Sequence, residues 1–456
     1  DFSTIFKTNT HRISRHEAPE YFYQISFSNG RNIIVTPEHP IFIYEKEGII
    51  TREASNIKKG DFIPVPAYLP NSSAEIKLYS HPSVPDPRAK EIDAPIVLSN
   101  SLARLIGYYV TEGHYHEGST VEFGISNMDR AILDEFKELM KQNFRLTPSI
   151  HKRDDGLVTL RYLSVELVKW FKFNFPEIMK KSRQKRIPWL IMRSSSSIAR
   201  DLLLTAFKGD GSVESTALCY RTTSKGLAFD YQDLLLKNGI QSRLIHDNYN
   251  DSYKVYIKGQ SLQEFYNLIG KEDNRRHKKI KKLINPGQKT NRHHDVFPTQ
   301  IANDIILLKK ELGMVYDGYF WRHLKEGHGI SRETLQNNLN LIRIRFNEIK
   351  IIFPKNFKKI SEIRTIFGIS QSTLAEIACL SRNNIDYYEN GGYSKKKREE
   401  IVSQVKQGLI NHMNKIRNLI EKLKNILSAD ILWNKITEIK KIPNKGKYYT
   451  PWVYDI

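Results

Sequence analysis

The chain has 456 residues, 40% of them hydrophobic, which is enough for about two to four domains with ordinary cores. It carries 71 Lys and Arg against 50 Asp and Glu, a formal net charge of +21. This excess predicts a polyanionic partner such as nucleic acid. No basic amphipathic anchor helix, long apolar run or secretory signal is evident, so we expect no membrane partner and a cytoplasmic setting.

Short alternating apolar runs, such as YFYQISFS and IFIYE, fill residues 1–90 between turn signals and predict a compact all-β unit. The Pro-rich stretch 80–95 is typical of a linker. Residues 97–285 read as helix, two strands and helix, a pattern that then repeats. Residues 286–427 are helical and basic, while residues 428–456 return to alternating runs. We therefore expect an α+β fold in which one β domain, formed by both ends, is split by the middle of the chain.

The stretches SLARLIGYYVTEGHY and ARDLLLTAFKGDGSV reveal the internal repeat most clearly. Each is an apolar helix that ends on an acid followed by glycine, Glu112 in the first and Asp210 in the second. A single acid there is most often a solvated helix end, but a carboxylate gains nothing from the carbonyl-rich C-terminus of a helix. The same arrangement in both halves therefore needs another cause.

Pairing of the two helices about a pseudo-twofold axis would bring Glu112 and Asp210 together. Small residues such as Gly107 and Ala206 would permit a close approach. Convergent carboxylates and peptide carbonyls suit Mg²⁺, and two such ions stabilise the attacking and leaving oxygens of a phosphoryl transfer. We expect two or more Mg²⁺ ions at this site.

The stretches LIGYYVTEG and LLTAFKGDG resemble the two signature helices of the LAGLIDADG, or DOD-type, homing endonucleases. This resemblance implies a pseudo-twofold αββαββα fold and makes Glu112 and Asp210 catalytic metal ligands. The stretch QKRIPWLI is similar to the family's K-x-I-P element, which makes Lys185 a catalytic candidate. Its second counterpart falls in KEDNRRHKKIKKLI, where Lys278 and Lys279 are the nearest equivalents. A phosphate-steering surface charge remains the alternative for each lysine.

Further basic residues accompany these elements and are expected to contact DNA. They are Arg183, Arg186, Arg275 and Arg276. The two cysteines, Cys219 and Cys379, lack the paired spacing of a zinc or redox site, so we expect both to be core thiols.

The segment GRNIIVTPEHPIFI places Thr36 and His39 three residues apart and resembles the Thr-x-x-His element of Hint domains in inteins. In that family the histidine assists the shift of a peptide bond to an ester or thioester. The end YYTPWVYDI is similar to the C-terminal Hint strands, in which Asp455 matches the acid of the last splicing element. A tight turn with a satisfied histidine is the alternative for His39.

The combined resemblance is to an archaeal-type intein, whose horseshoe-shaped Hint domain is split by an endonuclease and flanked by a host extein. Splicing in that family needs a nucleophile at the first residue and a terminal His-Asn pair. This chain starts at Asp1 and stops at Ile456, so we expect it not to splice as it stands.

Residues 369–392 have the apolar spacing of a helix-turn-helix, with Leu374, Ala375, Ile377 and Ile385 facing inward. The segment resembles bacterial repressors, whose second helix enters the major groove. The residues then expected to face DNA are Ser381, Arg382, Asn383, Asn384 and Asp386, followed by Lys395, Lys396, Lys397 and Arg398 as phosphate contacts. An ordinary αα-hairpin is the alternative.

The leading interpretation is an intein-encoded homing endonuclease. It would act as a monomer on a long, asymmetric double-stranded DNA site and break both strands with Mg²⁺. The first alternative is a DNA-binding regulator that cleaves nothing. The second is an autoprocessing Hint protein whose insert is inert.

Overall fold

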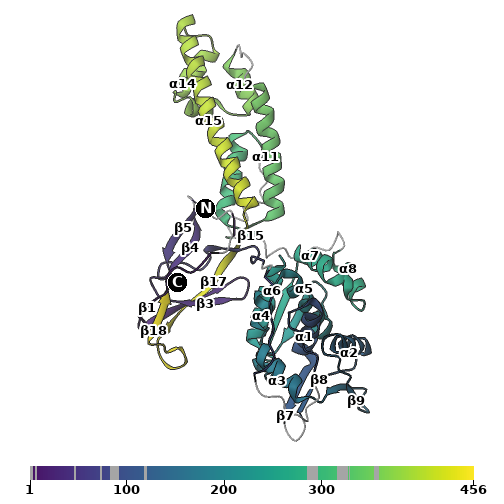
Figure 1. The fold of residues 1–456 in the computed structure, drawn as a ribbon. Coiled ribbons are helices and arrows are strands. Elements are labelled where there is room, and N and C mark those ends of the chain that lie inside the picture. Colours follow the sequence, from purple (N-terminus) through teal and green to yellow (C-terminus); the bar gives the residue numbers. More distant parts are fainter. Residues whose placement is uncertain are drawn as a thin grey trace.

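The computed structural model describes residues 4–5, 8–45, 48–71, 74–82, 92–117, 121–284, 296–315, 327, 329–353 and 359–455. It confirms the mixed α+β class. Three parts are visible in Figure 1: a β unit, a mixed unit of helices and sheets beside it, and a long helical arm. Most of the predicted linker lies outside the described residues. Within the described segments, no helix has the length and apolarity needed to cross a bilayer.

The β unit joins the two ends of the chain. Its four-stranded sheet has the order β3-β2-β17-β6, so β17 lies between two strands from the N-terminal region. Ile439 of β17 faces Ile25 of β2, and Trp433 of β17 faces Pro64 of β6. The strands of this unit are β1 (Ser14–Glu17), β2 (Tyr21–Phe27), β3 (Asn32–Val35), β4 (Pro40–Glu45), β5 (Gly48–Glu53), β6 (Phe62–Pro66), β17 (Ile431–Pro443) and β18 (Trp452–Asp455). The pairs β4-β5 and β1-β18 complete it.

The mixed unit contains two repeats of the same element order. The first consists of α1 (Asn100–Glu112), β7 (Gly113–Glu117), β8 (Val121–Asn127), α2 (Arg130–Phe144), β9 (Ser149–Lys152), β10 (Val158–Tyr162) and α3 (Val165–Asn174). After η1 (Ser182–Gln184) and α4 (Trp189–Arg193), the second consists of α5 (Ser196–Asp210), β11 (Gly211–Val213), β12 (Leu218–Thr222), α6 (Lys225–Lys237), β13 (Arg243–Asp247), β14 (Ser252–Ile257) and α7 (Ser261–Leu268). The sheet orders correspond: β7-β8-β10-β9 and β11-β12-β14-β13.

The helices α1 and α5 pack against each other at the centre of the mixed unit. Both begin in the same way, because the hydroxyls of Ser99 and Ser195 accept the backbone N–H groups of Leu102 and Ile198. Most residues of both helices are fully buried, as expected for helices that face a neighbour on one side and a sheet on the other.

Glycine allows the two helices to approach closely at two matching places. A Cβ on Gly107 would lie 2.1 Å from Thr205 Oγ1 and 2.5 Å from the Leu202 carbonyl oxygen. A Cβ on Gly209 would lie 2.3 Å from Thr111 Oγ1. Gly107 occupies in the first motif the place of Thr205 in the second, and Thr111 occupies that of Gly209. Each contact therefore joins equivalent positions of the two repeats, as expected where the helices cross the pseudo-twofold axis, and the expected role of Gly107 agrees with this geometry.

The arm stands on the β unit (Figure 1). Its elements are β15 (Val296–Phe297), α9 (Thr299–Glu311), β16 (Ile330–Ser331), α11 (Arg332–Ile352), α12 (Ile360–Phe367), α13 (Gln371–Ile377), α14 (Arg382–Glu389) and α15 (Lys395–Ser428). The apolar core of the arm continues into the β unit through Tyr44, Phe62 and Trp433, which are all buried.

Candidate active site

Both central helices end on their acid and pass directly into a strand. Gly113 follows Glu112 with φ −78° and ψ 149°, and Gly211 follows Asp210 with φ −76° and ψ 146°. These are extended conformations, so neither helix has the left-handed C-cap that commonly ends a helix. The two acids therefore lie at the base of the paired helices, where each sheet begins.

The two carboxyls have strongly perturbed acidity. Burial and, to a smaller extent, the nearby charge of Asp210 raise the pKa of Glu112 to about 7, while Lys185 and a hydrogen bond with Asn127 act in the opposite direction. Burial also raises the pKa of Asp210 to about 6 against the charges of Lys185 and Arg276. The site thus holds negative charge that the surrounding protein compensates only in part.

Lys185 is buried beside the first acid and is only 5% exposed. Its Nζ donates hydrogen bonds to the carbonyl oxygens of Tyr109 (3.0 Å), Val110 (3.1 Å) and Gly113 (2.8 Å). Burial lowers the pKa of Lys185 to about 8, although Asp210 and Glu112 both favour its charged form. The surface-charge alternative therefore does not fit this residue.

Arg276 takes the matching place at the second helix. Its Nη1 donates to the carbonyl oxygens of Phe207 (2.9 Å) and Lys208 (3.2 Å), which stand where Tyr109 and Val110 stand in the first motif. It also donates to Asp273 Oδ2 at 3.0 Å. Lys278 or Lys279 is expected at this place, but both are exposed on α8 (His277–Ile284). The expected DNA contact of Arg276 likewise disagrees with its 9% exposure.

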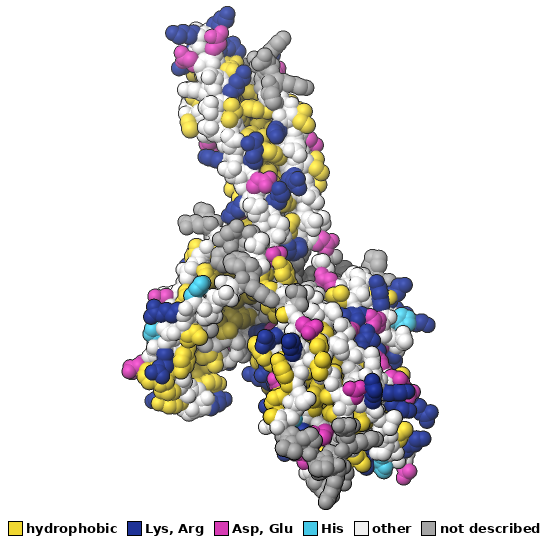
Figure 2. Space-filling view, viewed as in Figure 1, with side chains coloured by type: hydrophobic (Ala, Val, Ile, Leu, Met, Phe, Trp, Pro, Cys, Tyr) yellow, Lys and Arg dark blue, Asp and Glu magenta, His cyan; other side chains and the backbone are white. Residues whose placement is uncertain are grey.

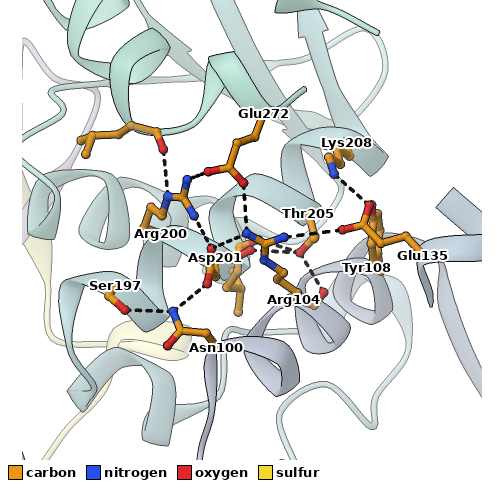
Figure 3. A network of polar contacts seen from close by, with 12 residues as sticks. Asn100, Arg104, Tyr108, Glu135, Ser197, Arg200, Asp201, Thr205, Lys208 and Glu272 are labelled. Atoms are coloured by element: carbon orange, nitrogen blue, oxygen red, sulfur yellow. Dashed lines mark hydrogen bonds and ion pairs between the residues drawn. The ribbon is translucent and has the colours of Figure 1, made fainter. Parts of the chain in front are cut away.

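A polar network joins Arg104 of α1 and Asp201 of α5 to Glu272 (Figure 3). Arg104 of α1 donates to Asp201 of α5 at 3.2 Å and to Glu272 at 3.0 Å. Glu272 belongs to η2 (Gly270–Glu272), which immediately precedes Asp273 and Arg276. Arg200 also pairs with Asp201 and with Glu272. The network thereby ties both central helices to the turn that positions Arg276.

The other expected DNA-contacting arginines of the mixed unit remain at least half exposed, but each has an acidic partner. Arg183 pairs with Asp251, and Arg275 donates to Asp129 at 2.9 Å. Arg186 binds Asp230 through two bonds of 2.6 and 2.7 Å. Because Asp230 also accepts the backbone N–H of Ile187, this fork fixes the segment just after Lys185.

The expected helix-turn-helix residues lie on α13, α14 and the start of α15. Leu374, Ala375 and Ile385 are buried, and Ile377 is half-buried. The residues exposed as expected are Ser381, Arg382, Asn383, Asp386, Lys395, Lys396 and Lys397. Asn384 is half-buried and accepts a bond from Tyr393. The half-buried Arg398 lies over the Tyr388 ring at 4.7 Å.

The expectation for the cysteines is half wrong. Cys219 is buried, but Cys379 is exposed between α13 and α14 with φ 53°. The tight turn between these helices holds Cys379 in a left-handed conformation and directs its side chain to solvent.

The residues expected to assist splicing lie in two places of the β unit. Thr36 and His39 are half-buried between β3 and β4, and the His39 N–H donates to the Thr36 carbonyl oxygen at 3.2 Å. Asp455 is at the end of β18, where its carboxylate lies 3.3 Å from Nε2 of His16. Asp455 thus lies against β1, where it pairs with Ser14.

The donor set at Glu112 and Asp210 fits a hard divalent cation. Within the described ranges, no three His, Cys, Asp or Glu side chains come together as a metal site. Mg²⁺ commonly uses only one or two carboxylates and completes its shell with water and substrate phosphate oxygens. Glu112 and Asp210 match that requirement, because their negative charge is only partly compensated and both lie at helix C-termini, where carbonyl oxygens gather.

The sequence profile of the intein splicing domain matches residues 2–456, and the chain belongs to this family. It is 24% identical over 493 aligned residues to the replication factor C small subunit of Methanocaldococcus jannaschii, covering 93% of this chain and 25% of that protein. It is 25% identical over 247 residues to the glutamine–fructose-6-phosphate aminotransferase of the same organism, covering 52% and 20%. The chain thus spans a fifth to a quarter of the length of these curated relatives. Among solved structures, I-DmoI in complex with DNA and Mn has a TM-score of 0.32 and 15% identity, covering 38% of this chain and 97% of that one.

Proposed function

We propose that the mixed unit of this intein-family chain is a site-specific DNA endonuclease of the LAGLIDADG type that hydrolyses both strands of a duplex with Mg²⁺. The observation that carries this proposal is the pair of acids, Glu112 and Asp210, at matching ends of two packed helices, each accompanied by a buried cation. Burying carboxylates with unmatched charge is costly unless a ligand compensates them. The same costly arrangement occurs in both repeats.

The roles of the residues follow from their contacts. Glu112 and Asp210 would hold Mg²⁺, which when bound supplies Lewis-acid stabilisation of the attacking and leaving oxygens. All three Lys185 protons are donated to carbonyl oxygens, so this residue acts through its charge and by fixing the end of α1. Arg276 does the same for α5 with a charge that cannot be removed at neutral pH. We therefore assign the second cation to Arg276 in place of Lys278 or Lys279.

The outer faces of the two sheets are the proposed DNA-binding surfaces. Arg161 lies on the first sheet near Glu122, while Arg221 and Lys254 are paired neighbours on the second. On the face in Figure 2, Lys and Arg side chains lie on parts of this unit and along the arm. Because the two faces carry different side chains, they would read two unlike half-sites, which gives a long, asymmetric target. Both repeats belong to one chain, so a monomer suffices.

An incision assay tests this proposal. A plasmid library with long randomised inserts would be incubated with the protein in Mg²⁺ or in EDTA, and linear products would be sequenced. Breaks at one recurring site in Mg²⁺ only are expected, with none from Glu112→Gln. Asp134→Asn, an exposed acid on α2, is the matched control and should cleave normally. Sequence-specific binding without any incision would instead favour the non-cleaving regulator.

We also propose that α14 extends the recognised DNA site. Arg382, Asn383 and Asp386 are exposed on one helix, and exposed lysines of α15 follow it. Arg382→Ala with Asn383→Ala should shorten the footprint on one flank and weaken binding by about 1–3 kcal/mol for each lost bidentate base contact. Glu421→Ala, exposed farther along α15, is the control. An unchanged footprint would leave the segment as a structural αα-hairpin.

For the β unit we propose that Thr36, His39 and Asp455 assist splicing in a longer polypeptide that also supplies the terminal splicing residues and the flanking exteins. His39→Ala in a longer polypeptide should stop cleavage at the upstream junction, whereas His11→Ala at an exposed position should not. Gel analysis of the precursor distinguishes these outcomes.

A further inference from the structure

The β2–β3 turn of the β unit docks on the second repeat of the mixed unit. The carbonyl oxygen of Asn29 accepts the backbone N–H of Leu244 in β13 at 2.9 Å and the Gln232 side-chain amide at 3.2 Å. β13 is the edge strand of the second sheet. The turn therefore gives this edge a hydrogen-bond partner from another unit.

Arg31 secures the turn on α6. Its Nε donates to Gln232 Oε1 at 2.9 Å, and its Nη2 donates to the Phe229 carbonyl oxygen at 2.7 Å. The same nitrogen lies 2.7 Å from Asp233 Oδ1, and the guanidinium lies over the Phe229 ring at 5.3 Å. Four contacts from one planar group fix the orientation of the turn more strongly than a flexible ammonium would.

Gly30 makes this approach possible. Its φ is +84°, and a Cβ there would lie 1.9 Å from the backbone oxygen of Leu244. A side chain would therefore meet both an unfavourable conformation and backbone that it could not displace without separating the two units.

The corresponding edge of the first sheet is exposed. All four residues of β9, the edge strand there, are exposed, including Ile150 at 52%. In β13 the side chain of Leu244 is buried, whereas Arg243 and Ile245 are exposed on the opposite face. Fixing the Leu244 backbone therefore fixes two side chains on the proposed DNA-facing surface.

We propose that Asn29, Gly30 and Arg31 are positioning residues for DNA recognition. Through them the β unit holds in place the DNA-binding surface of the second sheet but not that of the first. This inference rests on the proposed DNA-binding function of the sheets. It predicts an asymmetric dependence: disturbing the turn weakens contacts to one half of the target and leaves the other half protected. The cleavage centre at Glu112 and Asp210 lies outside the turn and stays intact.

The test uses the full chain with two matched pairs of variants. Gly30→Ala is compared with Gly48→Ala, because Gly48 also has positive φ (+121°) but has open space around its Cβ. Arg31→Ala is compared with Arg52→Ala, which loses an ion pair to Glu45 within the β unit. Arg31→Lys is included as the conservative variant and should recover part of the effect.

Two readouts separate this inference from the proposed function. Hydrogen exchange without DNA should show a faster Leu244 amide in Gly30→Ala and Arg31→Ala, with the Leu160 amide of the first sheet unchanged. Hydroxyl-radical footprinting should show lost protection in the second-sheet half-site and about tenfold weaker binding, the effect of losing about one base contact. Cleavage at saturating protein should persist.

Each outcome decides one claim. Variant footprints equal to those of the two controls, or unchanged Leu244 exchange, would overturn the positioning role. Faster Leu244 exchange combined with no wild-type footprint would overturn the proposed DNA-binding function, and the DNA part of this inference with it. Equal loss of protection in both half-sites would show general destabilisation and contradict the asymmetry.

Discussion

The two repeats of the mixed unit share one scaffold but differ in the groups placed on it. The first ends its central helix on Glu112 with Lys185 at the carbonyls, and the second ends on Asp210 with Arg276. Two equivalent backbone oxygens are bonded in each repeat, those of Tyr109 and Val110 in the first and those of Phe207 and Lys208 in the second. The comparison teaches that the position of charge relative to the helix end is common to both repeats, while the residue that supplies it differs.

Loss of either acid should have the largest effect on activity. Glu112→Gln and Asp210→Asn are each expected to reduce double-strand cleavage by at least about 10³-fold, because each would remove a charged ligand from the proposed centre of phosphoryl transfer. DNA affinity should stay within about tenfold, since few phosphate contacts change. Supercoiled-plasmid cleavage beside a binding assay measures both. Full activity of either variant in Mg²⁺ would show that the repeats are not equivalent at the acids.

Neutral replacements of the cations should come next in size. Lys185→Met and Arg276→Met are each expected to slow cleavage by about 10²-fold, the scale of losing one positioned electrostatic group. Lys278→Met and Lys279→Met, both exposed, serve as matched controls and should cleave at the normal rate. A slow Lys279→Met with a normal Arg276→Met would reverse our assignment of the second cation. Single-turnover rates at saturating protein measure the effect.

The glycine contacts provide a stability comparison. Gly107→Ala should destabilise the fold by about 3 kcal/mol, because its Cβ meets the Leu202 backbone oxygen as well as a side chain. For Gly209→Ala the three nearest atoms all belong to the Thr111 side chain: Oγ1 at 2.3 Å and Cγ2 at 3.3 Å can rotate away, whereas Cβ at 2.9 Å requires a small shift of the helices. Alanine also gains up to about 1 kcal/mol of helix propensity. We therefore expect a smaller cost there, of about 1 kcal/mol. Urea unfolding of both variants decides the order, and equal costs would contradict the assigned asymmetry.

The smallest expected effect is a pH dependence of stability without metal. The folded pKa values of Glu112 and Asp210, about 7 and 6, lie above the ordinary values of 4.5 and 3.8. The folded state therefore binds protons that the unfolded state has released, so stability should rise as pH falls from about 8 toward about 5. Asp210→Asn should weaken this dependence and raise the Tm at high pH, whereas Asp134→Asn should not. Mg²⁺ should raise the wild-type Tm more at about pH 8 than at about pH 6.

Much of the site could be predicted because its signals are local. The acids Glu112 and Asp210 follow apolar helical runs directly, and Lys185 precedes the Ile187–Pro188 pair that marks its element. The position of Arg276 at the end of α5 was not predicted, because its segment contains many cations and residue counting alone does not choose among them. Its signal was periodicity: Arg276, Ile280 and Leu283 are buried on one face of the turn and helix.

Other features depend on contacts between distant segments, which the sequence does not display. Arg276 donates to the carbonyl oxygens of Phe207 and Lys208 at the end of α5, which lie 69 and 68 residues earlier in the chain. The docking of Gly30 against Leu244 joins positions more than two hundred residues apart. No local propensity encodes either partner, so these contacts could not be predicted. The α+β class could be, because it follows from the local periodicity of each segment.

The apolar junction between the arm and the β unit restricts how this protein could lose its insert. Tyr44, Phe62 and Trp433 are almost fully covered, and the arm provides part of that cover. If the arm were deleted, these three large side chains would form a contiguous exposed apolar patch, which promotes aggregation. A shortened descendant of this chain would therefore need polar replacements at these positions, and their identity in such sequences would record whether an arm was once present.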